Sequence, residues 1–304
     1  MKKRKGQFIR NVKRSGQLYA FIFLAFLSIL VFAYLPMYGI LMAFQNFSPL
    51  RGVMGSPWVG FNHFRMFFND FFFWDIMYNT IFLSLYQIIA SFPMPIILAL
   101  AFNEIKGGFF KKFTQTVTYA PHFISVVVMT GMVISFLTPD GIINNLVGFV
   151  GIAPRNFLSL PQWFSSIYVW SQIWQSTGWG TVIYLAALAG VDPTLHEAAI
   201  VDGATRLKRV WHINLPAIRP VVVVLLIMSF GSIMTNGFER IILLQTPLNL
   251  SRSRVISTFV FEMGIEGGRF SYATAIGLFN SVINVILLTT VNIISKKVSG
   301  SGLW

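Results

Sequence analysis

The sequence predicts an all-α polytopic membrane protein with six transmembrane helices and both termini in the cytoplasm. Of its 304 residues, 55% are hydrophobic and only 11% are charged, whereas soluble domains carry about 25% charged residues. Six apolar runs each approach or exceed the ~20 residues that cross about 30 Å of hydrocarbon. All ten lysines fall in four segments that an even number of crossings leaves on one side of the membrane.

The first apolar run covers residues 18–44 and follows a basic N-terminus over residues 1–17. A cleaved secretory signal would have an apolar core of about 7–15 residues. This run is longer, so we expect an uncleaved first helix whose preceding charges set its orientation, without a nucleic acid partner. Residues 45–75 should then form a polar and aromatic extracytoplasmic loop.

The other five runs form a core over residues 76–295, which a cytoplasmic tail over residues 296–304 follows. The expected spans cover residues 76–102, 114–138, 165–190, 221–245 and 271–295. Pro93 and Pro95 should bend the second span, because proline lacks a backbone donor. A short helix is expected over residues 142–152, in the outer loop after the third span.

Basic residues predict the orientation of the spans. Sixteen of the 23 Lys and Arg lie in the N-terminus, residues 103–113, residues 191–220 and the C-terminus. The positive-inside rule places these four segments in the cytoplasm. The remaining seven basic residues are arginines on the opposite side.

The most informative of these segments is the charged stretch over residues 191–220, which must emerge into water between two apolar runs. Asp192 can cap a helix that begins with proline, where the missing N–H costs nothing. Gly203 permits a turn. Asp202 is expected to cap a second short helix, which Pro216 ends.

The order of residues in this stretch resembles the EAA loop of permease subunits in bacterial binding-protein-dependent ABC importers. The matching residues are Glu197, Ala198, Ala199, Gly203, Ile213, Leu215 and Pro216, with Asp202, Ala204 and Pro220 as in sugar importers. The resemblance covers roughly residues 70–295 and implies the type I ABC importer permease fold. Residues 35–47 and 58–64 are similar to LplB-type permeases, which belong to importers of oligosaccharides.

This resemblance implies a permease subunit of an ATP-driven carbohydrate importer in the bacterial plasma membrane. The implied partners are a second homologous permease in a heterodimer, two ABC ATPases, an extracytoplasmic solute-binding lipoprotein and an oligosaccharide. Contact with an ATPase is implied for Glu197, Ala198, Ala199, Asp202, Gly203 and Ala204. In this arrangement the alanines allow close approach, Glu197 meets a basic residue of the ATPase, and Gly203 is a hinge. Trp211, Leu215 and Pro216 should pack the loop against the ends of the spans.

The chain itself offers no catalytic motif. It contains no Gly-rich loop ending in Gly-Lys-Ser/Thr, no HExxH pair and no Gly-x-Ser-x-Gly elbow. The absence of cysteine excludes disulfides and thiolate metal sites. We therefore expect no enzymatic activity and no cofactor or metal bound by this chain, with ATP and Mg held by the partner ATPases.

Polar and aromatic side chains within the runs are the candidates for a substrate path, because sugars bind to planar polar groups and aromatic faces. The candidates are Tyr86, Gln87, Trp170, Trp174, Gln175, Asn236, Glu239, Asn280 and Asn284. Each could instead join two helices, and tryptophans at span ends could belong to an interfacial belt. Glu239 is expected near the outer mouth, about 28 Å beyond Pro220 along a continuous helix.

Two other functions are compatible with parts of the sequence. One is a permease of the same superfamily for another solute, such as a peptide. Few charges within the spans favour a neutral polyol over that alternative. The other is an ATPase-independent channel or membrane scaffold, but such a function would not explain the residue pattern of the charged stretch over residues 191–220.

Overall fold

The computed structural model describes residues 15–149, 151–234, 237–299 and 302. Within these residues the chain is helical, apart from one isolated bridge between Gln45 and Trp58. The helices are α2 (Gly16–Ile29), η1 (Leu30–Tyr34), η2 (Leu35–Phe44), α3 (Gly52–Gly55), α4 (Asn62–Phe68), α5 (Phe73–Ser91), α6 (Pro93–Glu104), α7 (Phe109–Tyr119), η3 (Ala120–Phe123), α8 (Val126–Leu137), α9 (Ile142–Gly148), η4 (Phe157–Ser159), α10 (Pro161–Ala189), α11 (Pro193–Val201), α12 (Arg206–Arg209), η5 (Val210–Asn214), α13 (Leu215–Gly231), α14 (Phe238–Leu244), α15 (Leu250–Ser253), α16 (Ile256–Phe261), η6 (Glu262–Glu266) and α17 (Phe270–Ser299).

Five stretches of this described part are long and apolar enough to cross a membrane. They are Gly16–Phe44, Phe73–Glu104, Val126–Gly148, Arg206–Gly231 and Phe270–Lys297. The all-α membrane protein is therefore confirmed. The fourth expected span corresponds to α10, which has 29 residues but is not among the five. Serine, threonine and glutamine recur along α10, and this lowers its hydropathy.

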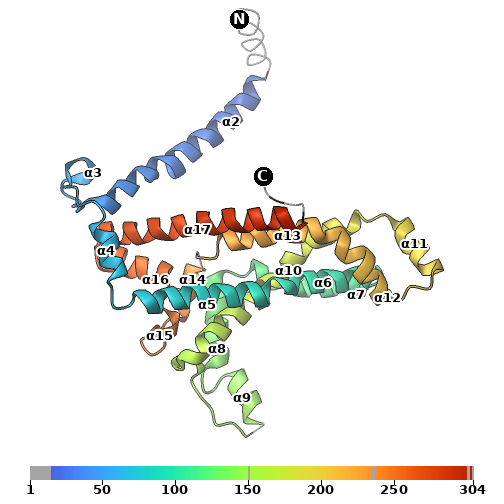
Figure 1. Cartoon of the computed structure of the whole chain (residues 1–304). Coiled ribbons are helices and arrows are strands. Elements are labelled where there is room, and N and C mark those ends of the chain that lie inside the picture. The colour runs from blue at the N-terminus through green and yellow to red at the C-terminus, as the bar shows by residue number, and fades with distance from the viewer. Residues whose placement is uncertain (1–14, 150, 235–236, 300–301, 303–304) are drawn as a thin grey trace, which may run out of the picture.

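Helix α10 lies at the centre of the bundle and has buried residues along its whole length. It packs against α5, α6, α7, α13 and α14. Helices α5, α6 and α13 run lengthwise beside it, and α17 lies against α13. Helices α11 and α12 are at one end and α3, α4, α15 and α16 at the other (Figure 1). The polar side chains of α10 thus face other helices, which reconciles its composition with a position inside the bundle.

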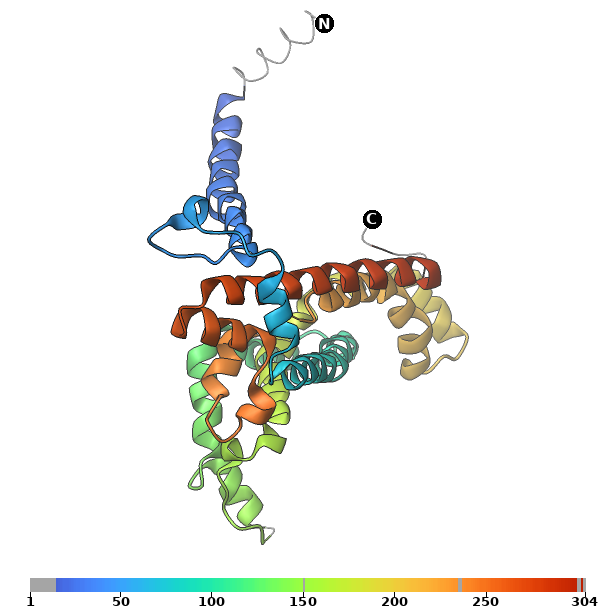
Figure 2. The same cartoon turned by 60° about the vertical axis from the view of Figure 1, so that its left-hand side comes forward.

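The first helix leaves the bundle. Helix α2 projects away from the other helices (Figures 1 and 2) and has no buried residue. It passes through a π-helical turn, η1, into η2, where Pro36 stands at the second position. The same arrangement recurs at η5, which precedes Pro216. A widened turn leaves room for the proline ring and skips the hydrogen bond that proline cannot donate.

This arrangement corrects the expected end of the second loop helix. Pro216 does not end it, because α12, η5 and α13 form one helical stretch from Arg206 to Gly231. The bend expected at Pro93 and Pro95 coincides with the junction of α5 and α6 at Phe92, whose backbone stays helical. The short helix expected after the third span is also confirmed, as α9.

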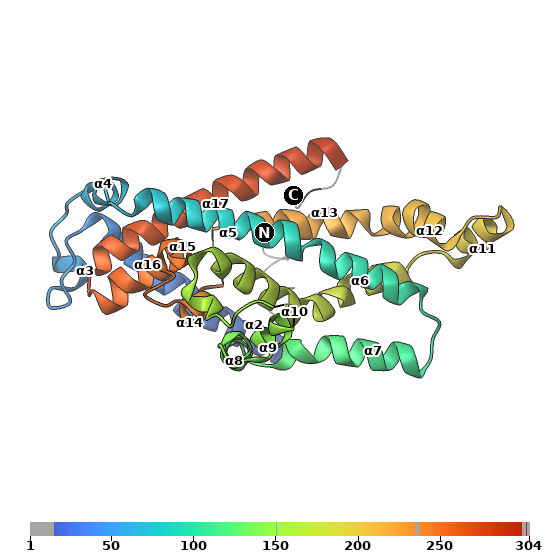
Figure 3. The same ribbon diagram turned by 90° about the horizontal axis from the view of Figure 1, so that it is seen from below.

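The third expected span is not one helix. Helix α7 ends at Tyr119, and η3 with an extended Ile124 separates it from α8. Figure 3 shows α8 nearly end-on while α7 lies lengthwise, so the two differ strongly in direction. Pro121 lacks a backbone donor, but Ala120 before it stays helical, and the backbone leaves the helical conformation only at Ile124.

The fifth expected span is also divided. Helix α13 ends at Gly231, and α14 begins only at Phe238. The expectation that Glu239 lies about 28 Å along one continuous helix from Pro220 is therefore wrong. The interruption brings α14 against α10, α8 and α16.

Candidate functional site

The charged stretch between α10 and α13 extends beyond the end of the bundle (Figures 1 and 2). Asp192 Oδ1 accepts a hydrogen bond from the backbone N–H of Thr194 at 2.9 Å, which confirms the expected helix cap. This bond lowers the pKa of the Asp192 carboxyl. Gly203 has φ +73°, the left-handed conformation that glycine adopts most easily, so the expected turn is confirmed.

Thr205, rather than Asp202, caps the second short helix. Thr205 Oγ1 accepts a hydrogen bond from the backbone N–H of Lys208 at 3.4 Å. Asp202 lies at the C-terminal end of α11, and its side chain is exposed. The turn at Gly203 separates it from the first turn of α12, so the role expected for Asp202 is wrong.

Apolar side chains of this loop are exposed. Val201 is 88% exposed and Trp211 is 64% exposed, and Ile200 and Leu207 are exposed beside them. The packing expected for Trp211 against the span ends is therefore wrong, although Leu215 is partly buried against a core cluster. Apolar groups on a charged segment that projects from a bundle mark a docking surface.

The small residues of the EAA pattern stand at the junction of the two loop helices. Glu197 and Ala198 are exposed on α11. The backbone N–H of Ala204 donates to the carbonyl of Ala199 at 2.8 Å and closes the turn. A cavity of about 220 Å³ at this junction is lined by Ala199, Ala204, Lys208, Arg209, His212 and Ile213. Within a few residues the loop therefore has an acidic side chain, several alanines and a small cavity with basic residues in its wall.

A second group of polar residues lies where α5, α10 and α14 meet, and it extends from buried positions to Trp170, which is 51% exposed. We call it the polar seam. Trp170 Nε1 donates to Tyr86 Oη at 3.1 Å. Tyr168 Oη donates to Gln87 Oε1 at 3.2 Å and accepts from the backbone N–H of Gly237 at 3.1 Å. Three expected path residues, Tyr86, Gln87 and Trp170, are thus brought together.

Arg240 attaches α14 to the same part of α10 and is only 3% exposed. Its guanidinium donates to Ser171 Oγ at 3.3 Å and to Gln175 Oε1. Gln175 Nε2 in turn donates to the carbonyl of Ile124, between α7 and α8, at 2.7 Å. Arg240 lies in the fifth expected span beside the candidate Glu239, which is exposed. An arginine within an apolar run is the sequence signal that marks this position.

Two cavities flank the polar seam. The larger, of about 420 Å³, lies between α8, α9 and α10, and its wall includes Trp163, Trp170, Ser171 and Trp174. The smaller, of about 150 Å³, lies between α5 and α13 and is lined by Ser84, Gln87, Ile88, Ser91, Phe92, Ser229, Ser232 and Ile233. Indole rings border one cavity and hydroxyl and amide groups the other, which together are the groups that bind a sugar.

The remaining candidates lie elsewhere. Asn284 Oδ1 on α17 accepts a hydrogen bond from the backbone N–H of Met234 at 3.0 Å, so it joins two segments. Asn280 Oδ1, one turn earlier, is buried and has no hydrogen-bond partner among the described residues. These two asparagines are not part of the polar seam. Asn236 lies outside the described residues.

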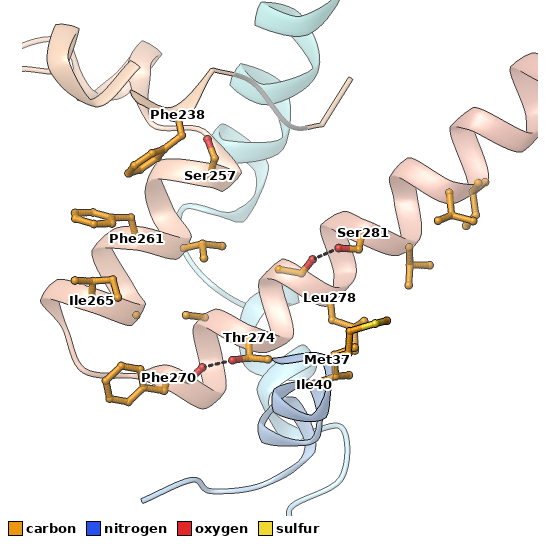
Figure 4. A pocket seen from close by; sticks show the side chains of 17 residues that line it. Met37, Ile40, Phe238, Ser257, Phe261, Ile265, Phe270, Thr274, Leu278 and Ser281 are labelled. Atoms are coloured by element: carbon orange, nitrogen blue, oxygen red, sulfur yellow. Dashed lines mark hydrogen bonds between the residues drawn. The ribbon is translucent and has the colours of Figure 1, made fainter. Parts of the chain in front are cut away.

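The largest cavity has different chemistry. It is an apolar groove of about 950 Å³ between η2, α16, η6 and α17 (Figure 4). Thr274 donates to the carbonyl of Phe270 at 2.7 Å, and Ser281 donates to that of Gly277 at 2.9 Å. Both hydroxyls are thus bonded to their own helix. The groove suits an apolar helix or a lipid chain better than a sugar.

Comparison with known proteins identifies the family of this chain. Residues 91–300 match the family described as binding-protein-dependent transport system inner membrane component. Protein LplB of Bacillus subtilis is 43% identical over 96% of this chain and 92% of its own length. The polygalacturonan/rhamnogalacturonan transport system permease protein YteP of the same species is 42% identical, over 99% and 94%.

A solved structure has the same fold over nearly the whole chain. It is the crystal structure of a bacterial alginate ABC transporter in complex with an alginate pentasaccharide-bound periplasmic protein. Its TM-score is 0.88 at 38% identity, covering 97% of this chain and 99% of that chain. The type I permease fold expected from the central loop is thereby confirmed. This chain therefore belongs to the family of binding-protein-dependent transport system inner membrane components.

Proposed function

We propose that this chain is the permease subunit of an ATP-driven importer of oligosaccharides and that its polar seam borders the translocation path. The observation that carries the proposal is the set of aromatic and amide side chains joined where α5, α10 and α14 meet. Such groups are costly next to lipid and are tolerated where they line a cavity or join helices. They are also the groups that stack on sugar rings and hydrogen-bond hydroxyls.

The names of the relatives support a saccharide substrate. YteP is a transport system permease for polygalacturonan and rhamnogalacturonan, and the solved transporter carries alginate. The substrate of this chain is accordingly an oligosaccharide delivered by an extracytoplasmic binding protein. Trp174, which lines the larger cavity, and Gln87, which lines the smaller one, are the first candidates for contact with it.

The loop at the opposite end docks on a separate ATPase subunit. Its exposed Glu197 meets a basic residue of that subunit, and Ala198, Ala199 and Ala204 allow close approach. Asp202 and Gly203 form the exposed turn between the two loop helices. The exposed apolar side chains beside them support this docking, because they would otherwise face water. ATP and Mg are bound by the ATPases and not by this chain.

A second permease completes the path. The unburied α2 and the apolar groove both support an apolar partner in the membrane. We infer six spans, with α10 as the fourth, and with both termini in the cytoplasm of a bacterial cell. Because the chain has no cysteine, single cysteines can test this topology. Val201→Cys should react with an impermeant maleimide only after the cells are opened, and Arg51→Cys should react in intact cells.

The function is tested by reconstituting the chain with its second permease, its ATPases and its binding protein in proteoliposomes. ATP-dependent uptake of a saccharide that the binding protein carries is the expected result. Uptake of peptides instead would favour another solute within the superfamily. Solute accumulation by the chain without an ATPase would refute the proposal and favour a channel or another mechanism.

A further inference from the structure

Arg240 places a positive charge inside the bundle without a carboxylate beside it. It forms no ion pair with any residue in 15–149, 151–234 or 237–299. Its Nε is buried and has no hydrogen-bond partner within the same ranges. Neighbouring Glu239 is exposed and outside ion-pair distance. In contrast, Arg254 lies 3.1 Å from Glu262 and stacks over Phe72.

A buried charge without a counter-ion is costly, and it persists within membrane proteins where it serves transport. The guanidinium donates both of its hydrogen bonds to neutral groups, Ser171 and Gln175, which solvate it but leave its charge uncompensated. A neutral side chain could join α14 to α10 without this cost. The charge itself therefore needs an explanation.

The position of the Arg240 guanidinium beside the two cavities suggests an explanation for the buried charge. Ser171, which accepts a hydrogen bond from Arg240 at 3.3 Å, belongs to the wall of the larger cavity. Gly237, the residue before α14, is linked through Tyr168 to Gln87, which lines the smaller cavity. A charge in such a low-dielectric setting acts over many ångströms, so it need not touch an anion to attract it.

We propose that Arg240 makes the path selective for oligosaccharides that carry carboxylate groups, such as oligouronates. It is a positioning residue that lowers the cost of bringing an anion into the polar seam. The inference rests on the proposed import of oligosaccharides and narrows its substrate class. An anionic substrate differs from the neutral polyol that the small number of charges within the spans favours.

The test compares uptake of an oligouronate with uptake of its methyl ester, which is neutral and has nearly the same shape. Both are delivered by the same saturated binding protein to the complete transporter in proteoliposomes. For each protein we take the uptake rate of the oligouronate divided by that of its methyl ester. The ratio of a variant is then divided by the ratio of the wild type, so that any preference of the binding protein for one saccharide cancels. A unit charge about 10 Å away at an effective dielectric constant near 20 changes this ratio by roughly tenfold to twentyfold.

Arg240→Gln should lower the ratio by that factor, because it removes the charge and keeps polar groups at the position. Arg254→Gln is the matched control, since it removes an arginine already paired with Glu262, and should leave the ratio unchanged. If Arg240→Gln leaves the ratio unchanged, or lowers both uptakes equally, Arg240 is structural and the inference is wrong. If the wild type imports neither saccharide, the proposed function itself fails.

Gln175→Glu gives a second route if the first variant does not assemble. It places a carboxylate within hydrogen-bond reach of the intact Arg240 and so neutralises the charge where it stands. The charged-to-neutral ratio should fall as it does in Arg240→Gln. An unchanged ratio in Gln175→Glu would overturn the inference by itself.

Discussion

Gly203 should control coupling between the loop and the ATPase through its backbone conformation alone. Its φ of +73° lies in the left-handed region, which costs most other residues about 1–2 kcal/mol. A Cβ at this position would meet nothing within 4 Å, so it brings no clash with the rest of the chain. The whole penalty therefore falls on the turn between α11 and α12. A penalty of this size reduces the population of the native turn by about 5- to 30-fold relative to alternatives.

The assay is ATPase activity of the complete transporter, stimulated by saccharide-loaded binding protein. Gly203→Val should lose most of the stimulation, because a β-branched residue is among the least tolerant of positive φ. Gly203→Asn is the matched control and should keep most of it, since Asn adopts this conformation far more readily. Equal stimulation in wild type, Gly203→Val and Gly203→Asn would refute the argument that this turn must hold its shape for docking.

Three further predictions follow from particular residues. Trp174→Ala should lower saccharide uptake without loss of assembly, because it removes an indole from the larger cavity; unchanged uptake kinetics would remove it from the path. Gly178→Val should lower the free energy of unfolding by more than about 2 kcal/mol and reduce the thermal stability of the purified complex, because any Cβ there would overlap the α7 backbone. At Gly131 a Cβ has open space, so Gly131→Ala should be tolerated. Asp192 has a lowered pKa, so its cap should stabilise α11 above the ordinary carboxyl pKa of about 4 and be lost as pH falls through the lowered value. Asp192→Asn should remove that pH dependence from hydrogen exchange of residues 193–201, and the same dependence in both proteins would contradict this.

The features that the sequence predicted correctly depend on residues close together in the chain. The apolar runs follow from composition, and the ends of α11 follow from an aspartate before proline and from Gly203, which act within a few residues. The interruption between α7 and α8 falls at Ile124, three residues after Pro121, and hydropathy averaged over a window does not register such a local change of the backbone. The exposure of Trp211 depends on which side of η5 faces the bundle, which only the three-dimensional packing decides.

The interruption between α13 and α14 could not be predicted in the same way. Two of the backbone N–H groups in this region, those of Met234 and Gly237, are bonded by side chains 50 and 69 residues away in sequence. The acceptors, Asn284 and Tyr168, come from two different helices. Partners at such separations have no trace in local sequence, and the bond between Gly237 and Tyr168 is part of the polar seam.

The continuous helical stretch from Arg206 to Gly231 has a mechanical consequence. Its 26 residues span about 39 Å, from the docking loop to the interruption beside the polar seam. A rigid rod of that length turns a tilt of ten degrees at one end into a displacement of roughly 7 Å at the other. Because the rod stops at Gly231, α14 and Arg240 need not follow that swing. A movement of the loop would thus widen or narrow the space beside a stationary charge.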